Sequence, residues 1–216
     1  MIIGITGKSG DGKTTAANIL NNLVPDSIVI NVDEYQVPML LKSKELINLY
    51  GSHIINNGTL NVRKFLENDL CFRKIHEVTK NRVMICLLNK IREYQENYKT
   101  IIIEWVRLPE LNDIWDLCDY HILVKSFNRK KRYENIIKRN RDIGYFLKDM
   151  NKELRLRDKN NLKYDEYLYD YIIENQYDDN FKIKIESIVE GLMKNTYKEN
   201  DNKILCKKLV NSLNQL

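Results

Sequence analysis

Residues 7–14 match the pattern G-x-x-x-x-G-K-[ST], a combination of residue types suited to holding phosphate groups. The glycines of such a loop let successive backbone N–H groups turn inward, and the following helix adds its positive N-terminus. Lys13 is expected to bridge the β- and γ-phosphates, and Thr14 to place its hydroxyl on Mg²⁺. The expected contacts of the nucleotide are Gly7, Lys8, Ser9, Gly10, Asp11, Gly12, Lys13, Thr14 and Thr15. We therefore expect a nucleoside triphosphate site that also binds Mg²⁺.

The segments on both sides of this loop support the match. Residues 2–6 form a short apolar run typical of a buried parallel strand, and apolar residues recur at helical spacing from Thr14 onward. The alternative is a Gly/Ser turn with an incidental lysine, which requires the flanking strand and helix to be coincidental. The strand, loop and helix together favour the phosphate site.

Two acidic residues follow predicted strands, Asp33 after residues 28–32 and Glu104 after residues 101–103. In a parallel sheet the carboxyl ends of the strands share one edge, so both acids are expected near the phosphate loop. Asp33 is the candidate to orient or deprotonate an attacking hydroxyl; the alternative is a polar strand end or helix cap. Glu104 is the candidate to hold Mg²⁺ through water or to contact substrate, and the alternative is a solvated loop acid.

The predicted strands alternate with helices along the chain. Further strands are expected at residues 120–124 and 170–175, and a mostly helical insert at residues 61–97. Five buried strands joined by helices indicate a parallel sheet with right-handed crossovers. The predicted fold class is therefore α/β, a three-layer α/β/α P-loop NTPase fold with a five-stranded parallel sheet.

The composition limits the remaining possibilities. The chain has 216 residues, enough for one domain, with 43% hydrophobic residues and a net charge of +5. No apolar run approaches the roughly 20 residues of a membrane helix, so no membrane partner is expected. The first residues already form a core strand, so we expect no cleaved leader and a cytoplasmic location. The four cysteines are scattered, which favours neither a zinc site nor a disulfide framework.

Several stretches resemble one enzyme family. The segment from Gly4 to Thr15 resembles the start of dephospho-CoA kinases and of related nucleoside and nucleotide kinases. Three further stretches resemble dephospho-CoA kinases in the same order: Asn31-Val32-Asp33, Gly58-Thr59-Leu60-Asn61 and Asp170-Tyr171-Ile172-Ile173-Glu174-Asn175. The resemblance covers roughly residues 1–193 and implies an ATP-dependent kinase that acts on a nucleotide-like small molecule.

The departures from the family pattern lie on the acceptor side. Only Asp33 remains of the family's D-x-D, the H-P pair falls near Lys80-Asn81, and an expected arginine falls at Val62. The family's P-L-L-[FL]-E is replaced by Glu104-Trp105-Val106-Arg107-Leu108-Pro109-Glu110. The sequence therefore supports ATP use better than dephospho-CoA as acceptor.

Basic residues gather in residues 125–159, which hold 13 Lys/Arg against 5 Asp/Glu. Arg132 and Arg139 lie close to one helical face with Arg129, and the resemblance implies that such arginines approach the phosphates, which their planar guanidinium groups bind well. Arg155 and Arg157 are expected in a basic helical lid over residues 144–160 that excludes water. The alternative for this segment is a solvated basic face.

The sequence thus predicts a P-loop kinase domain over residues 1–193, which contains the helical insert at residues 61–97 and the lid at residues 144–160. Residues 194–216 are predicted to form a polar tail that is either a docking helix or mobile. The predicted partners are ATP and a nucleotide-like acceptor. Alternatives are a nucleoside or deoxynucleoside monophosphate kinase and a degenerate kinase that serves as a nucleotide-binding regulator. A nucleic-acid-dependent NTPase ranks last, because the basic helix shows no interleaved pattern of aromatic residues for base stacking. The sequence does not predict the oligomeric state.

Overall fold

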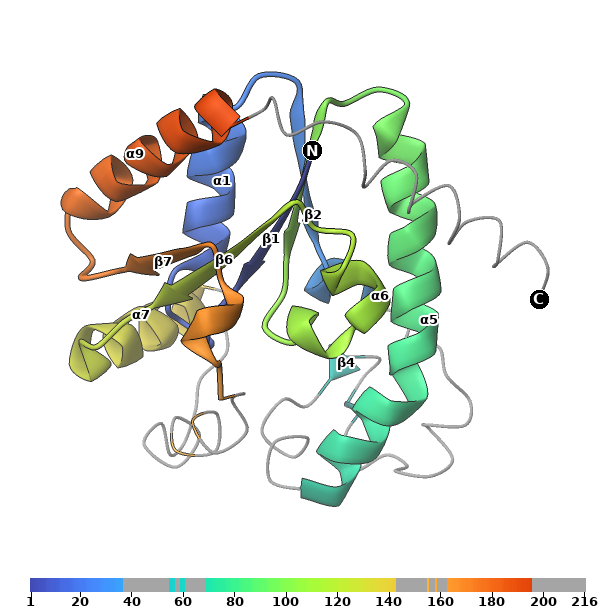
Figure 1. The fold of residues 1–216 in the computed structure, drawn as a ribbon. Coiled ribbons are helices and arrows are strands. Elements are labelled where there is room, and N and C mark those ends of the chain that lie inside the picture. Colours follow the sequence, from blue (N-terminus) through green and yellow to red (C-terminus); the bar gives the residue numbers. More distant parts are fainter. Residues whose placement is uncertain are drawn as a thin grey trace.

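Five parallel strands form the centre of the structure, a computed structural model (Figure 1). They are β1 (Ile2–Thr6), β2 (Ser27–Asn31), β5 (Thr100–Glu104), β6 (Tyr120–Lys125) and β7 (Tyr171–Glu174), and their order in the sheet is β2-β5-β1-β6-β7. The structure describes residues 1–36, 55–56, 59–60, 69–142, 155, 158 and 163–195. For residues 55–56, 59–60, 69–76, 78, 139–142 and 194–195 it describes the backbone alone.

Helices cover both faces of this sheet. On one face lie α1 (Lys13–Leu23) and α9 (Asn180–Asn195), which pack against each other. On the other lie α5 (Asp69–Gln95), the 3₁₀ turn η2 (Leu108–Glu110) and α6 (Asn112–Trp115), as Figure 1 shows. Each face has its own cluster of buried apolar side chains, so the molecule has three layers.

The remaining described elements lie in the connections between the strands. They are α7 (Arg129–Asp142), the 3₁₀ turn η3 (Glu166–Leu168) and a small antiparallel pair, β3 (Ile55–Asn56) with β4 (Thr59–Leu60). None of the helices in the described part of the chain is both long and apolar enough to span a membrane.

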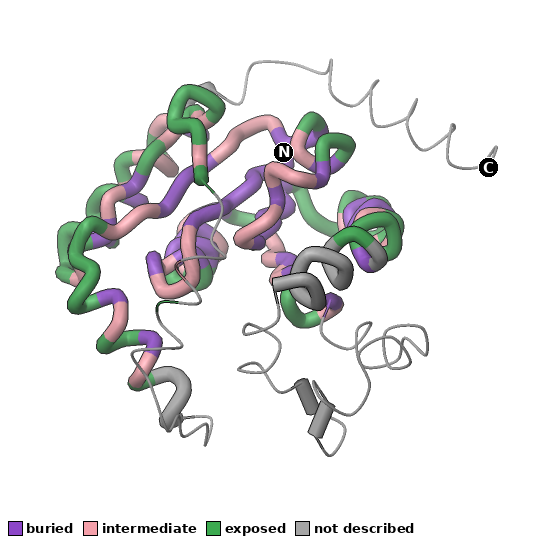
Figure 2. The backbone as a smooth tube through the Cα atoms, turned by 90° about the horizontal axis from the view of Figure 1, so that it is seen from below, coloured by how far each residue is buried: buried purple, intermediate pink, exposed green. Residues whose placement is uncertain are grey.

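Local sequence explains why the central elements form. All five residues of β1 and of β5 are buried, and Figure 2 shows the central strands as the most buried part of the chain. Runs of isoleucine suit such positions, because parallel strands are covered on both faces. Helix α1 ends at Leu23, and the backbone of its C-cap residue Val24 is extended, because the residue before Pro25 is disfavoured in a helical conformation.

The structure confirms the predicted fold class and shifts the boundaries of the elements by a few residues. The predicted insert corresponds to α5, with residues 61–68 outside the described residues, and its apolar stripe packs into the core at Val83, Leu87, Leu88 and Ile91. Most of the predicted lid, residues 144–160, and the whole tail beyond residue 195 also lie outside the described residues.

Candidate active site

The loop between β1 and α1 depends on three glycines. Gly7, Gly10 and Gly12 all have positive φ, at 151°, 85° and 103°. A Cβ at Gly7 would lie 2.1 Å from the carbonyl oxygen of Val124, and one at Gly12 would lie 2.4 Å from Nδ2 of Asn175. No side chain caps the N-terminus of α1. The loop is therefore tightly enclosed, and the helix N-terminus that follows it suits an anion.

Lys13, Thr14 and Glu104 meet at the start of α1. The Lys13 ammonium donates to the carbonyl of Lys8 at 3.2 Å and lies 3.8 Å from Oε1 of Glu104. The Thr14 hydroxyl donates to Oε2 of Glu104 at 3.1 Å. Glu104 ends β5, which pairs with β1, so this carboxylate lies beside the loop as predicted from the sheet geometry. An ammonium group can bind phosphate oxygens, and a hydroxyl and a carboxylate can bind a divalent metal ion.

Asp11 brings a buried carboxylate into the loop itself. One oxygen, Oδ2, accepts from the backbone N–H of Lys8 at 3.0 Å, whereas Oδ1 accepts no hydrogen bond and lies 3.9 Å from Nη1 of Arg132. Burial raises the pKa of Asp11 from its ordinary 3.8 to about 6, and the nearby charges of Arg132 and Lys13 oppose this rise only in part. Near neutral pH the loop therefore carries a carboxylate that burial disfavours.

Arg132 of α7 lies against the loop and is only 5% exposed. Besides Asp11 it contacts Asp158, which accepts hydrogen bonds from Nη2 of Arg132 and from the hydroxyl of Tyr133. Arg129, one turn earlier, is exposed and lies 3.2 Å from the same carboxylate. The Nε of Arg132 donates no hydrogen bond. The guanidinium group of Arg132 thus faces the loop. The carboxylates of Asp11 and Asp158 occupy positions beside it where the oxygens of an anionic ligand could also bind.

Asn175 and Tyr177 close the loop from the side of β7. The Asn175 amide donates to the carbonyl of Asp11 at 2.8 Å and accepts from the backbone N–H of Tyr177 at 2.7 Å. The Tyr177 hydroxyl donates to the carbonyl of Gly10 at 2.7 Å. Sequence reasoning did not name either residue as part of the site. The signal that was present is the asparagine that ends the last predicted strand, at the same edge of the sheet as the loop.

Asp33 lies beyond the end of β2 and is exposed. Its Oδ1 accepts from the indole N–H of Trp105 at 3.0 Å, and its backbone N–H donates to the side-chain oxygen of Asn31 at 3.1 Å. Asp33 therefore sits at the expected edge of the sheet, where its described contacts are with Trp105 and Asn31. Trp105 was noted in the sequence only as a departure from a family pattern.

Besides Asp33, the structure places the predicted site residues as follows. The loop residues, Glu104 and Arg132 come together around the start of α1. Arg155 is exposed, and the side chains of Arg139 and Arg157 lie outside the described residues. No three His, Cys, Asp or Glu side chains gather into a metal site within the described ranges.

The chain is similar in sequence to curated proteins named dephospho-CoA kinase. It is 31% identical to that of Borreliella burgdorferi over 134 residues, which are 59% of this chain and 63% of that protein. It is 30% identical to that of Borrelia garinii over 131 residues, 58% of this chain and 62% of that protein. The matched region therefore covers less than two thirds of the length of either relative. No protein-family model matches it.

Solved structures share the fold at low sequence identity. TT1252 from Thermus thermophilus superposes with a TM-score of 0.66 at 19% identity, over 91% of this chain and 97% of that one. A dephospho-CoA kinase from Campylobacter jejuni has a TM-score of 0.55 at 16% identity, over 89% and 97%. A shikimate kinase from Bacteroides thetaiotaomicron has a TM-score of 0.51 at 16% identity, over 89% and 98%. The fold is that of P-loop kinases.

Proposed function

We propose that this chain is an ATP- and Mg²⁺-dependent phosphotransferase that moves the γ-phosphate of ATP to a nucleotide-like small molecule, with dephospho-CoA as the first acceptor to test. The observation that carries the proposal is the complete phosphate loop, with Lys13 and Thr14 both in contact with Glu104 at the end of β5. The sequence similarity to proteins named dephospho-CoA kinase supports the choice of acceptor.

The phosphates of ATP would lie in the cradle of residues 7–15. The backbone N–H groups of the loop and of the first turn of α1 bind their oxygens, and Lys13 exchanges its contacts with Lys8 and Glu104 for the β- and γ-phosphates. Arg132, which already faces two carboxylates, binds phosphate oxygens in their place. Arg139 is proposed to assist from the same helix. These cations stabilise the charge that spreads over the transferred group.

The chemistry of Thr14 and Glu104 fits Mg²⁺. A hydroxyl and a carboxylate oxygen 3.1 Å apart are both hard oxygen donors. Mg²⁺ commonly takes only one or two protein oxygens and completes its shell with water and substrate phosphates. When bound, Mg²⁺ would neutralise charge on the departing phosphoryl group. Thr14 and Glu104 are proposed to hold it, Glu104 directly or through water.

Asp33 is proposed to receive the acceptor hydroxyl. It is exposed, and one of its oxygens is already fixed by Trp105, which leaves Oδ2 to accept from a substrate. A carboxylate within hydrogen-bond reach of the attacking hydroxyl can orient it and take its proton. Phosphoryl transfer needs little more from the protein than this positioning and charge stabilisation.

The test is consumption of Mg-ATP by the purified chain with a panel of acceptors: dephospho-CoA, nucleosides and nucleoside monophosphates. We expect turnover with one acceptor class that is lost in Lys13→Ala and kept in Lys99→Ala, an exposed lysine paired with Asp26 far from the loop. If only nucleoside monophosphates were turned over, they would replace dephospho-CoA as the proposed acceptor. ATP binding without turnover of any acceptor would refute the proposal in favour of a nucleotide-binding regulator.

A further inference from the structure

Two consecutive residues at the end of β5 reach different parts of the site. Glu104 contacts Lys13 and Thr14 at the start of α1, where the phosphates of the nucleotide are proposed to bind. Trp105, the next residue, donates its indole N–H to Oδ1 of Asp33 at 3.0 Å. Successive side chains of an extended segment point in opposite directions, so one short stretch of backbone sets the position of both groups.

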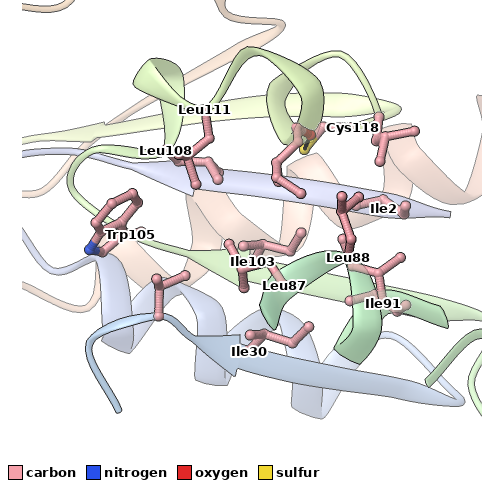
Figure 3. Close-up of a cluster of buried hydrophobic side chains, with 14 of the residues drawn as sticks. Ile2, Ile30, Leu87, Leu88, Ile91, Ile103, Trp105, Leu108, Leu111 and Cys118 are labelled. Atoms are coloured by element: carbon pink, nitrogen blue, oxygen red, sulfur yellow. Dashed lines mark hydrogen bonds between the residues drawn. The ribbon is translucent and has the colours of Figure 1, made fainter. Parts of the chain in front are cut away.

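Trp105 is itself held firmly. Its ring is 3% exposed and belongs to the apolar cluster under α5 and α6. In Figure 3 it lies at one end of that cluster, with its nitrogen on the side of the ring away from the other labelled side chains. Its backbone N–H donates to the carbonyl of Ile5 at 3.1 Å, which ties it to β1 immediately before the phosphate loop.

Asp33, in contrast, is exposed, and a free aspartate side chain in such a position would sample several rotamers. The backbone at this point is fixed at two places: the Val32 N–H donates to the Glu104 carbonyl at 3.2 Å, and the Asp33 N–H donates to Asn31 at 3.1 Å. The indole N–H then fixes the carboxylate itself. A donor that is itself anchored in the core restrains the rotamer of an exposed acid in this way.

We propose that Trp105 is a positioning residue for phosphoryl transfer: its buried indole holds the Asp33 carboxylate in one orientation relative to the phosphate loop, so that Oδ2 faces the acceptor hydroxyl. This inference rests on the proposed function, because it assigns a task to Asp33. The indole touches neither ATP nor acceptor and acts through Asp33.

The first test detects the hydrogen bond without any activity. The chain has two tryptophans, so Trp115→Phe leaves one indole N–H resonance in a ¹H–¹⁵N spectrum, that of Trp105. We expect Asp33→Ala to move this resonance upfield and to speed exchange of the indole proton with solvent. Glu34→Gln, beside Asp33, is the matched control and should leave the resonance in place. A resonance unchanged by Asp33→Ala would overturn the proposal.

The second test asks whether the bond matters for catalysis. Trp105→Phe keeps a ring in the core and removes the donor, and we expect kcat to fall about 10- to 100-fold, with the KM for ATP within about twofold. Trp115→Phe should leave kcat unchanged. In an Asp33→Asn background, Trp105→Phe should lower the residual rate by less than about threefold, because the group that it positions is already altered. An equal loss in both backgrounds would mean that Trp105 only supports the fold, and would overturn the proposal.

The two tests also separate this inference from the proposed function. If the wild-type chain turns over no acceptor, the proposed function and the catalytic task of Trp105 both fall, while the indole resonance still shows whether the bond to Asp33 exists. If acceptors are turned over and Trp105→Phe has full kcat, the proposed function stands and the positioning role is refuted.

Discussion

Replacing Asp11 by asparagine should stabilise the protein at neutral pH, although it removes a charge beside an arginine. Burial raises the pKa of Asp11 from 3.8 to about 6, so the folded state binds this proton more tightly than the unfolded state. The side chain is about 2% exposed, so little solvent screens this effect. A difference of about 2 pH units corresponds to about 3 kcal/mol.

The direction of the pH dependence follows from this rise in pKa. Below about pH 4 Asp11 is protonated in both states, and its ionisation costs the folded state nothing. As the pH rises from about 4 to 6, the unfolded state loses the proton first, and the free energy of unfolding declines. Asp11→Asn carries no such proton. It should match the wild type near pH 4 and exceed its stability by about 3 kcal/mol at pH 8.

The assay is urea unfolding followed by far-ultraviolet circular dichroism at several pH values between 4.5 and 8, without nucleotide. The exposed Asp113→Asn is the matched control and should change stability by less than about 0.5 kcal/mol at every pH. A constant difference between Asp11→Asn and wild type across the range would refute the reasoning. So would a less stable variant at pH 8, because the attraction of Arg132 would then outweigh the cost of burial.

Three further substitutions test the walls of the site. Gly12→Ala should weaken ATP binding at least tenfold in calorimetry, because its φ is 103° and the new Cβ meets Asn175; Gly191→Ala, in α9, is the control that should bind normally. Asn175→Ala should lower the free energy of unfolding by about 1–3 kcal/mol in urea, since the Asp11 carbonyl loses a buried donor; equal stability would contradict this. Glu104→Gln should raise the Mg²⁺ concentration for half-maximal turnover by about tenfold or more. An unchanged Mg²⁺ requirement would exclude Glu104 as a ligand.

The parts that sequence predicted are those fixed by neighbours along the chain. The loop follows from the spacing of Gly12, Lys13 and Thr14, and the strands follow from runs such as Ile101-Ile102-Ile103. The position of Glu104 was predicted because the carboxyl ends of parallel strands share one edge of the sheet. This rule applies even when the exact order of the strands is not known.

The parts that sequence did not predict depend on which side chains meet across the fold. Asn175 reaches Asp11 across 164 positions, and Trp105 reaches Asp33 across 72. No local spacing encodes such pairs. The burial of Asp11 likewise results from the packing of α7 over the loop, so a loop residue that looks polar and exposed in the sequence becomes a buried acid.

The contacts of the loop also determine when, during synthesis, the nucleotide site becomes complete. The loop leaves the ribosome before the strands on either side of β1, which lie about a hundred residues later in the chain, and Asn175 and Tyr177 are made later still. A nascent chain that ends before β7 has the whole phosphate-binding motif and lacks two of the hydrogen bonds that hold its carbonyls. Such distant pairings form late and slowly. ATP binding should therefore be a property of chains in which the sheet has formed through β7. Ribosome-stalled chains of increasing length should bind ATP only after β7 has emerged.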